Sequence, residues 1–139
     1  MLKPRKNNFI IVLILSITLL FILFILADEI RTIGRKEVQV SFKVANNPGF
    51  DLNDSALTFG SIPPGQSATR SLFITNEFER KVKVVIKIKG EIEKYLYVSE
   101  NNFFLEPKEG RKVNFTVILP DNIPLGERTG IIEVRFNKI

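Results

Sequence analysis

The sequence predicts an all-β domain, a β-sandwich of seven or eight strands, preceded by one transmembrane helix. Three observations support this prediction. Positions 9–27 form one uncharged, strongly apolar run. From position 38 onward, apolar and polar residues alternate in several short segments, and a period of two is that of a half-buried strand. Clusters of Pro, Gly and Asn separate these segments, and no helical period follows the first run.

The membrane span is predicted at 9–27, with the sequence FIIVLILSITLLFILFILA. A helix of this length extends about 28 Å, close to the roughly 30 Å hydrocarbon core of a bilayer. The hydroxyls of Ser16 and Thr18 suit this environment because they can donate to carbonyl groups of the preceding turn. The competing interpretation is a cleaved signal peptide ending at Ala27. A signal has an apolar core of only about 7–15 residues, and Ile25 stands where it needs a small residue.

Charge on the two flanks of the span predicts its orientation. The short N-terminal flank, residues 1–8, is basic through Lys3, Arg5 and Lys6. The other flank opens with two acidic residues, Asp28 and Glu29. Because basic flanks tend to stay in the cytoplasm, we expect a cytoplasmic N-terminus, and an extracytoplasmic domain held at the cell membrane.

Length and charge limit the rest of the chain. At 139 residues, it has room for one domain of ordinary size and a short appended segment. We expect a membrane-proximal linker at 28–37 and the β domain at 38–139. Setting aside the three basic residues of the N-terminal flank leaves 17 of the 20 Lys and Arg against 15 Asp and Glu. This excess is too small to indicate nucleic-acid binding.

The chain contains neither cysteine nor histidine. Disulfides, thiolate nucleophiles, histidine acid–base catalysis and the usual zinc sites are therefore excluded. The carboxylates are scattered through predicted turns, and no glycine-rich phosphate loop precedes a helix. We therefore expect no enzymatic activity, no cofactor and no small-molecule substrate.

Alternation locates the strands of the β domain. The longer candidates lie at 38–44, 72–74, 82–88, 113–119 and 132–136, and the shorter ones at 56–59, 95–99 and 103–105. Turn signals separate them, at 46–49 (NNPG), 63–65 (PPG), 89–90 (KG), 107–110 (PKEG) and 120–126 (PDNIPLG). Strands of this number and spacing are typical of a sandwich.

The order of these turns resembles that of immunoglobulin-like domains of prokaryotic, above all archaeal, cell-surface proteins. Residues 57–67 (LTFGSIPPGQS) resemble the opening half of such a domain. The closing half is represented by 103–110 (FFLEPKEG), a long strand to Pro120, Pro124-x-Gly126 and Gly130-Ile131-x-x-Val134. The resemblance covers about residues 38–139. It implies an immunoglobulin-like sandwich and a role in adhesion or in support of carbohydrate-active enzymes.

A row of lysines is one candidate interaction surface. These residues occupy one phase of a strand whose other phase is Val and Ile: Lys81, Lys83, Lys87 and Lys89. Such a row can meet anionic headgroups, an acidic protein or an acidic glycan. It can equally be a solvated face that opposes edge-to-edge aggregation.

Apolar residues on the polar phase of their strands are a second candidate surface: Phe73, Tyr95, Tyr97 and Ile131. An exposed patch of this kind would dock a second copy of the chain or another surface protein. The other interpretation is that a sheet edge or a loop covers these side chains.

Two asparagines, Asn53 and Asn114, lie in glycosylation acceptor patterns that apply if the domain is translocated. The segment Asp51-x-Asn53-x-Ser55 also begins like a calcium loop. Ala56 and Ile62 occupy the positions where such a loop needs glycine and a bidentate acid, so we expect no metal site.

These features lead us to expect a membrane-anchored interaction module that binds another cell-envelope protein or a second copy of itself. The alternative is a carbohydrate- or solute-binding accessory domain, because Tyr95 and Tyr97 form the one aromatic pair suited to sugar stacking. The absence of tryptophan, the strongest sugar-stacking side chain, argues against this alternative.

The predicted topology can be tested in spheroplasts. Because the span should stay in the bilayer and the domain should lie outside, protease added to intact spheroplasts should digest the domain and leave a small membrane fragment. An epitope tag placed after Ile139 reports the outcome. A tag that is protected until the membrane is permeabilised contradicts the orientation, and a tag released into the medium identifies a cleaved signal peptide.

Overall fold

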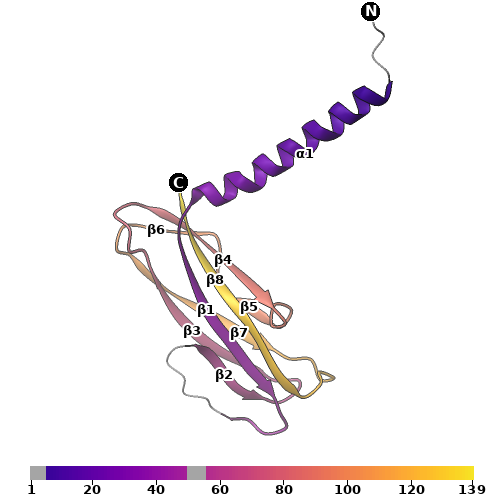
Figure 1. The fold of residues 1–139 in the computed structure, drawn as a ribbon. Coiled ribbons are helices and arrows are strands. Elements are labelled where there is room, and N and C mark those ends of the chain that lie inside the picture. The colour runs from indigo at the N-terminus through magenta and orange to yellow at the C-terminus, as the bar shows by residue number, and fades with distance from the viewer. Residues whose placement is uncertain (1–5, 50–55) are drawn as a thin grey trace, which may run out of the picture. The chain divides into compact units, whose positions relative to one another are not determined.

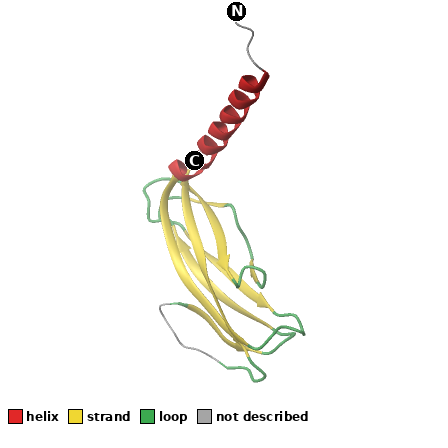
Figure 2. Ribbon diagram, turned by 45° about the vertical axis from the view of Figure 1, so that its right-hand side comes forward, coloured by secondary structure: helices red, strands yellow, loops and turns green. Residues whose placement is uncertain are grey.

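The computed structural model describes residues 6–49 and 56–139. They belong to two units, Met1–Thr32 and Ile33–Ile139. The first unit contains a helix, α1 (Lys6–Arg31), and the second is built of strands (Figures 1 and 2). The chain is therefore a mostly β protein with one N-terminal apolar helix.

Helix α1 contains a 20-residue stretch, Asn8–Ala27, that is long and apolar enough to cross a membrane. Its two hydroxyl residues satisfy their donors within the helix. Ser16 donates to the carbonyl oxygen of Leu13 (2.8 Å) and Thr18 to that of Ile14 (2.9 Å), as the sequence predicted. Its crossing of a membrane and its direction stay predictions.

The second unit contains eight described strands in two sheets (Figure 1). Every segment that alternation predicted overlaps one of them, and residues 56, 95, 99 and 119 of these segments lie just outside the strands. The five-stranded sheet has the order β2-β1-β8-β4-β6, and the three-stranded sheet has the order β3-β7-β5. The strands are β1 (Thr32–Val44), β2 (Leu57–Ile62), β3 (Ser67–Thr75), β4 (Val82–Gly90), β5 (Leu96–Val98), β6 (Phe103–Leu105), β7 (Gly110–Ile118) and β8 (Gly126–Lys138).

The predicted linker at 28–37 is not a loop. Helix α1 extends to Arg31, and β1 begins at Thr32. Strand β1 is hydrogen-bonded beside β8 in the five-stranded sheet, and its first residues also contact the segment after β3. A Cβ atom on Gly34 would lie 2.6 Å from the Phe78 ring, so the missing side chain lets that ring approach. Lys36 donates to Glu77 at 2.7 Å. A polar segment containing glycine has the composition of a linker, and only these distant partners show that it is a strand.

One hydrophobic core lies between the two sheets, which is an arrangement compatible with a sandwich. The inward phase of the five-stranded sheet contributes Phe42, Val84 and Ile132, and that of the three-stranded sheet contributes Val113 and Phe115. All of these side chains are at most 2% exposed. Since the chain has no cysteine, the domain is stabilised by packing of this kind and not by disulfides.

Asn76 is a fully buried polar residue at the end of β3. Its side-chain amide donates to the carbonyl oxygens of Arg80 (2.8 Å), Leu105 (3.2 Å) and Glu106 (2.9 Å). Its side-chain oxygen accepts from the backbone N–H of Phe78 (3.0 Å). One side chain therefore connects the segment that leads into β4 with the segment that follows β6.

Replacement of Asn76 by alanine should destabilise the domain by about 2–4 kcal/mol, because it leaves buried backbone carbonyl groups without donors. Asn76→Asp should also destabilise it, since a carboxylate cannot donate to those carbonyls. Chemical denaturation of the full chain measures both changes. An unchanged denaturation midpoint in both variants would show that solvent replaces these hydrogen bonds.

Candidate interaction surface

The outer face of the three-stranded sheet is the best candidate for a binding surface. Its side chains come from the phase of β3, β7 and β5 that points away from the core. They are mostly small hydroxyl and amide groups with large apolar residues at the ends of the face: Thr69, Ser71, Phe73, Lys112, Asn114, Thr116, Ile118 and Tyr97. Lys112 is the one charged member of this group.

Hydrogen bonds between strands tie the middle of this face together. Thr69 and Thr116 are register partners, and their hydroxyl oxygens lie 2.9 Å apart. Ser71 donates to the side-chain oxygen of its register partner Asn114 at 2.8 Å. The polar groups in the centre of the face thus satisfy one another, which is the usual behaviour of cross-strand Ser, Thr and Asn pairs.

The ends of the face are apolar and open to solvent. Phe73 is 72% exposed, Tyr97 is 56% exposed and Ile118 is 50% exposed. Phe73 lies over Gly110 of β7, because a Cβ atom on Gly110 would lie only 2.3 Å from the Phe73 ring. Along β7, the partner of Phe73 is four residues from the partner of Tyr97, so these two aromatic rings lie about 13 Å apart along the strand direction.

The structure separates the four apolar residues that the sequence grouped together. Phe73 and Tyr97 lie on this face, whereas Ile131 is half-buried on β8 of the other sheet. Tyr95 packs its ring edge-on against Phe42 of the core, with centroids 6.1 Å apart. Ile118 also lies on the polar phase of its predicted strand, 113–119, so the alternation that identified Phe73 could have identified it, but the sequence analysis did not include it.

The predicted lysine row lies on the outer face of the five-stranded sheet, along and just before β4. Its charge is partly neutralised within the chain. Lys81 pairs with Glu106 at 2.5 Å, and Lys89 pairs with Glu133. Lys87 is the register partner of Glu133, and Lys83 that of Asn137. This pattern favours the interpretation of a charged face that protects the sheet over that of a cationic binding site.

Glu133 on β8 is a buried acid that sequence reasoning missed, because its place in the alternation predicted a solvated side chain. It has no exposed surface, and it is surrounded by Lys89, Arg135 and Arg35, whose Nε lies 4.0 Å from the carboxylate. Burial alone raises the pKa of this carboxyl group. Hydrogen bonds from Lys89 and Arg135, and the positive charge of both, outweigh burial and lower the pKa from 4.5 to about 2.

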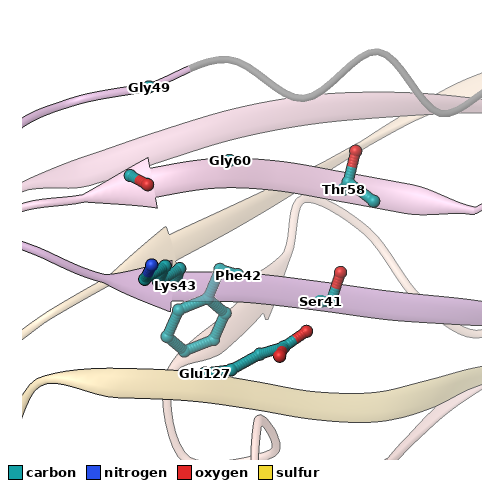
Figure 3. A pocket seen from close by; sticks show the side chains of 8 residues that line it. Ser41, Phe42, Lys43, Gly49, Thr58, Gly60 and Glu127 are labelled. Carbon is teal, nitrogen blue, oxygen red and sulfur yellow. The ribbon is translucent and has the colours of Figure 1, made fainter.

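A polar hollow of about 320 Å³ lies between β1, β2 and β8 (Figure 3). The register of β1 with β2 shifts between Ser41 and Lys43, and Gly60 adopts a positive φ of 70°. This bulge parts the two strands and explains the hollow. Figure 3 shows the carboxylate of Glu127 directed toward Ser41 on the neighbouring strand. This feature could not be predicted from the sequence, since a bulge depends on how two strands pair.

Asn114 is exposed at the centre of the outer face of the three-stranded sheet. Its side chain is reachable for glycosylation, although in the folded sheet it is bonded to Ser71. Asn53, with Asp51 and Ser55 of the calcium-like pattern, lies outside the described residues. In the described part of the chain, no group of three or more acidic residues is placed to hold a metal ion.

Comparison with known proteins found no family model, no curated protein and no solved structure that matches this chain.

The ion-pair cluster around Glu133 predicts a specific loss of stability in acid. The folded state lowers the pKa from 4.5 to about 2, so the stabilisation is complete above pH 4.5 and is lost as pH falls toward 2. Between pH 4.5 and pH 2, the unfolding free energy of the wild type should fall by about 2–3 kcal/mol more than that of Glu133→Gln, because the glutamine side chain does not ionise. Urea titrations at several pH values measure this difference. Parallel pH profiles for the two proteins would contradict it.

Proposed function

We propose that this chain is a membrane-anchored module that binds another cell-envelope protein through the outer face of its three-stranded sheet, outside the cytoplasm. One observation carries the proposal. This face has a single charged side chain, Lys112, and three large exposed apolar ones, Phe73, Tyr97 and Ile118. The centres of protein interfaces are similarly depleted of charge and enriched in aromatic residues.

The hydroxyl groups in the centre of the face lower the cost of covering it. A polar group that loses water on binding destabilises a complex unless it keeps a hydrogen-bond partner. Thr69 and Thr116 already bond to each other, and Ser71 bonds to Asn114, so these groups keep a partner when water leaves. On the five-stranded sheet, a partner would instead have to cover Lys89 and Arg35, whose side chains remain 52% and 38% exposed.

The location outside the cytoplasm is supported by the apolar stretch of α1 and by the basic flank before it. The two sheets around one core, joined by the Pro- and Gly-rich turns, support an immunoglobulin-like domain. Domains of this class bind partners through sheet faces and edges, so the proposed surface agrees with the proposed fold.

Carbohydrate binding is the second candidate function. Its support was the pair Tyr95 and Tyr97, but the Tyr95 ring packs against Phe42, and the Lys94 ammonium lies 5.1 Å from the centroid of the same ring. Tyr97 remains as a lone stacking platform beside the hydroxyl of Thr116. One ring offers little area for a sugar, which places this function behind protein binding.

Photo-crosslinking in intact cells tests the proposed surface. A crosslinking amino acid at Tyr97 or Phe73 should trap a defined envelope protein, because both side chains project from the proposed interface. The matched control places the same group at Gln39, which is exposed on β1 of the other sheet. Ile118→Asp should weaken the adduct at Tyr97 without unfolding the domain, since Ile118 is half exposed. Equal, non-specific adducts from both sheets would contradict the proposal.

Two further outcomes separate the alternatives. A glycan attached to Asn114 would cover the centre of the face, so mass spectrometry of the native protein should find this asparagine unmodified. Binding on a glycan panel that is lost in Tyr97→Ala, together with no protein adduct, would favour the carbohydrate function instead.

A further inference from the structure

The edges of the two sheets differ in how well they are protected. Strands β5 and β6 are edge strands of three residues each. Edge strand β2 is bonded on its outer side, where Ser61 exchanges two backbone hydrogen bonds with Gly49 (2.8 and 3.1 Å). Strand β3 is an edge strand of nine residues with an unbroken register against β7. It contains no proline, lysine or bulge, which are devices that protect many edges, and its one charged residue is Arg70, which donates to the carbonyl oxygen of Thr58 on β2 (3.2 Å).

Hydrogen bonds at both ends of β3 show which backbone groups face its open edge. At one end, the N–H of Leu119 donates to the carbonyl of Gln66, and at the other the N–H of Asn76 donates to the carbonyl of Glu109. Gln66 and Asn76 thus belong to hydrogen-bonded pairs with β7 and its flanking residues. Bonded and non-bonded pairs alternate along an antiparallel ladder, so the even-numbered residues of β3 between them also bond to β7. The register partner of Ser71 agrees with this alternation. The backbone carbonyl of Asn114 accepts from the N–H of Ser99 on the β5 side (2.9 Å) and not from β3. The odd-numbered residues, including Thr69, Ser71 and Phe73, therefore direct N–H and C=O to the open edge.

An apolar crevice lies directly beneath this edge. It has a volume of about 80 Å³, and its lining includes Leu72 and Ile74 of β3, Val38 of β1 and Phe136 of β8. Leu72 and Val38 are only half-buried, although both lie on the inward phase of their strands. The two sheets thus leave inward-facing apolar surface uncovered beside Leu72 and Ile74, on the side where no described strand is hydrogen-bonded to β3.

From the open edge and the crevice together, we propose that β3 binds an extended segment of another envelope protein as a fourth strand of this sheet. Backbone bonds to the odd-numbered residues would hold a segment of about nine residues. Because side chains alternate along a strand, every second one would face the inner side of the sheet and should be apolar, and one of them would enter the crevice beside Leu72 and Ile74. This inference rests on the proposed function and specifies how the partner is held.

Charge around the edge favours acidic residues in the partner segment. Strand β3 and its register partners on β7 include three basic side chains, Arg70, Arg111 and Lys112, and no acidic one. Arg111 is paired with Glu100 and Glu109, each at 3.3 Å. Arg70 and Lys112 form no ion pair within the described residues, so the edge keeps an excess of positive charge.

A second copy of this chain fits the edge less well. Lys36, near the start of the β domain, contacts Glu77, just after β3. The chain thus enters the domain at the end where β3 finishes. Two β3 strands paired about a twofold axis would run antiparallel, which puts their two entrances about 30 Å apart at opposite ends of the pair. Two copies anchored in one membrane could form this antiparallel pair only if the paired strands lay parallel to the membrane. A segment of another protein has no such constraint.

A peptide-binding experiment on the full chain in nanodiscs tests this inference. The probe is a fluorescent peptide of alternating design, Glu-Val-Thr-Val-Asp-Val-Thr-Ile-Glu, and its control has the same residues with the apolar ones clustered at one end. The alternating peptide should bind the wild type, and the control should bind at least about tenfold more weakly, because only alternation fills the crevice while pairing with β3.

Substitutions of Ser71 provide a matched pair of variants. Ser71→Pro removes an N–H from the open edge but none from the ladder with β7, so binding should fall at least about tenfold while the domain stays folded. Ser71→Ala keeps that N–H, so it should bind the peptide more tightly than Ser71→Pro does. Thermal unfolding confirms the fold of each variant. Should the proline variant unfold, hydrogen exchange of the wild type decides, since the peptide must protect the amides of Thr69, Ser71 and Phe73.

Three results would overturn the inference. These are equal binding of both peptides, undiminished binding by a folded Ser71→Pro variant, and exchange protection confined to other strands. Dimers that crosslink through β3 without peptide, and disappear in Ser71→Pro, would assign the edge to a second copy instead. A specific adduct at Tyr97 in cells together with failure of the peptide experiment would leave the proposed function standing and reject only this mode of binding.

Discussion

The side-chain amide of Asn76 is the interaction on which the arrangement of the two sheets depends. The chain passes between the sheets twice at this corner, from β3 to β4 and from β6 to β7. Asn76 bonds to Arg80 on the first crossing and to Leu105 and Glu106 on the second. Its backbone N–H also bonds to Glu109 at the start of β7, which sets the register of β3 and hence the residues that face the open edge.

Local sequence pattern was sufficient for the strands and insufficient for what lies on their outer sides. Alternation located all eight strands, because an inward apolar phase is a property of each strand alone. Gly34 was taken for linker because its partner, Phe78, is far along the chain. Alternation places Glu133 on the solvent phase of β8, but Lys and Arg side chains from three strands bury it. The surroundings of Gly34 and Glu133 are determined by tertiary contacts that no local pattern contains. The outward direction of Ile118, by contrast, follows from the alternation of the predicted strand 113–119.

The outer faces of the two sheets solve the same problem in opposite ways. Both present polar groups that must be satisfied, either by solvent or by one another. The five-stranded sheet uses full charges and gathers them around Glu133, so that covering it would mean desolvating several partly exposed cations. The three-stranded sheet uses neutral hydroxyl and amide groups that bond in register pairs. Neutral, satisfied groups cost little to bury, which leaves this sheet as the one suited to a partner.

The face and the open edge of the three-stranded sheet are parts of one surface, because the same residues of β3 form both. Side-chain direction and hydrogen-bond direction each alternate with a period of two along a strand. In β3 the two alternations coincide: Thr69, Ser71 and Phe73 point their side chains to the outer face and their backbone groups to the edge. A segment added at the edge would therefore continue the hydroxyl row of the face beside Thr69 and Ser71 and lie next to the exposed ring of Phe73. A partner that presents a strand together with an apolar surface could engage the edge and the face at once.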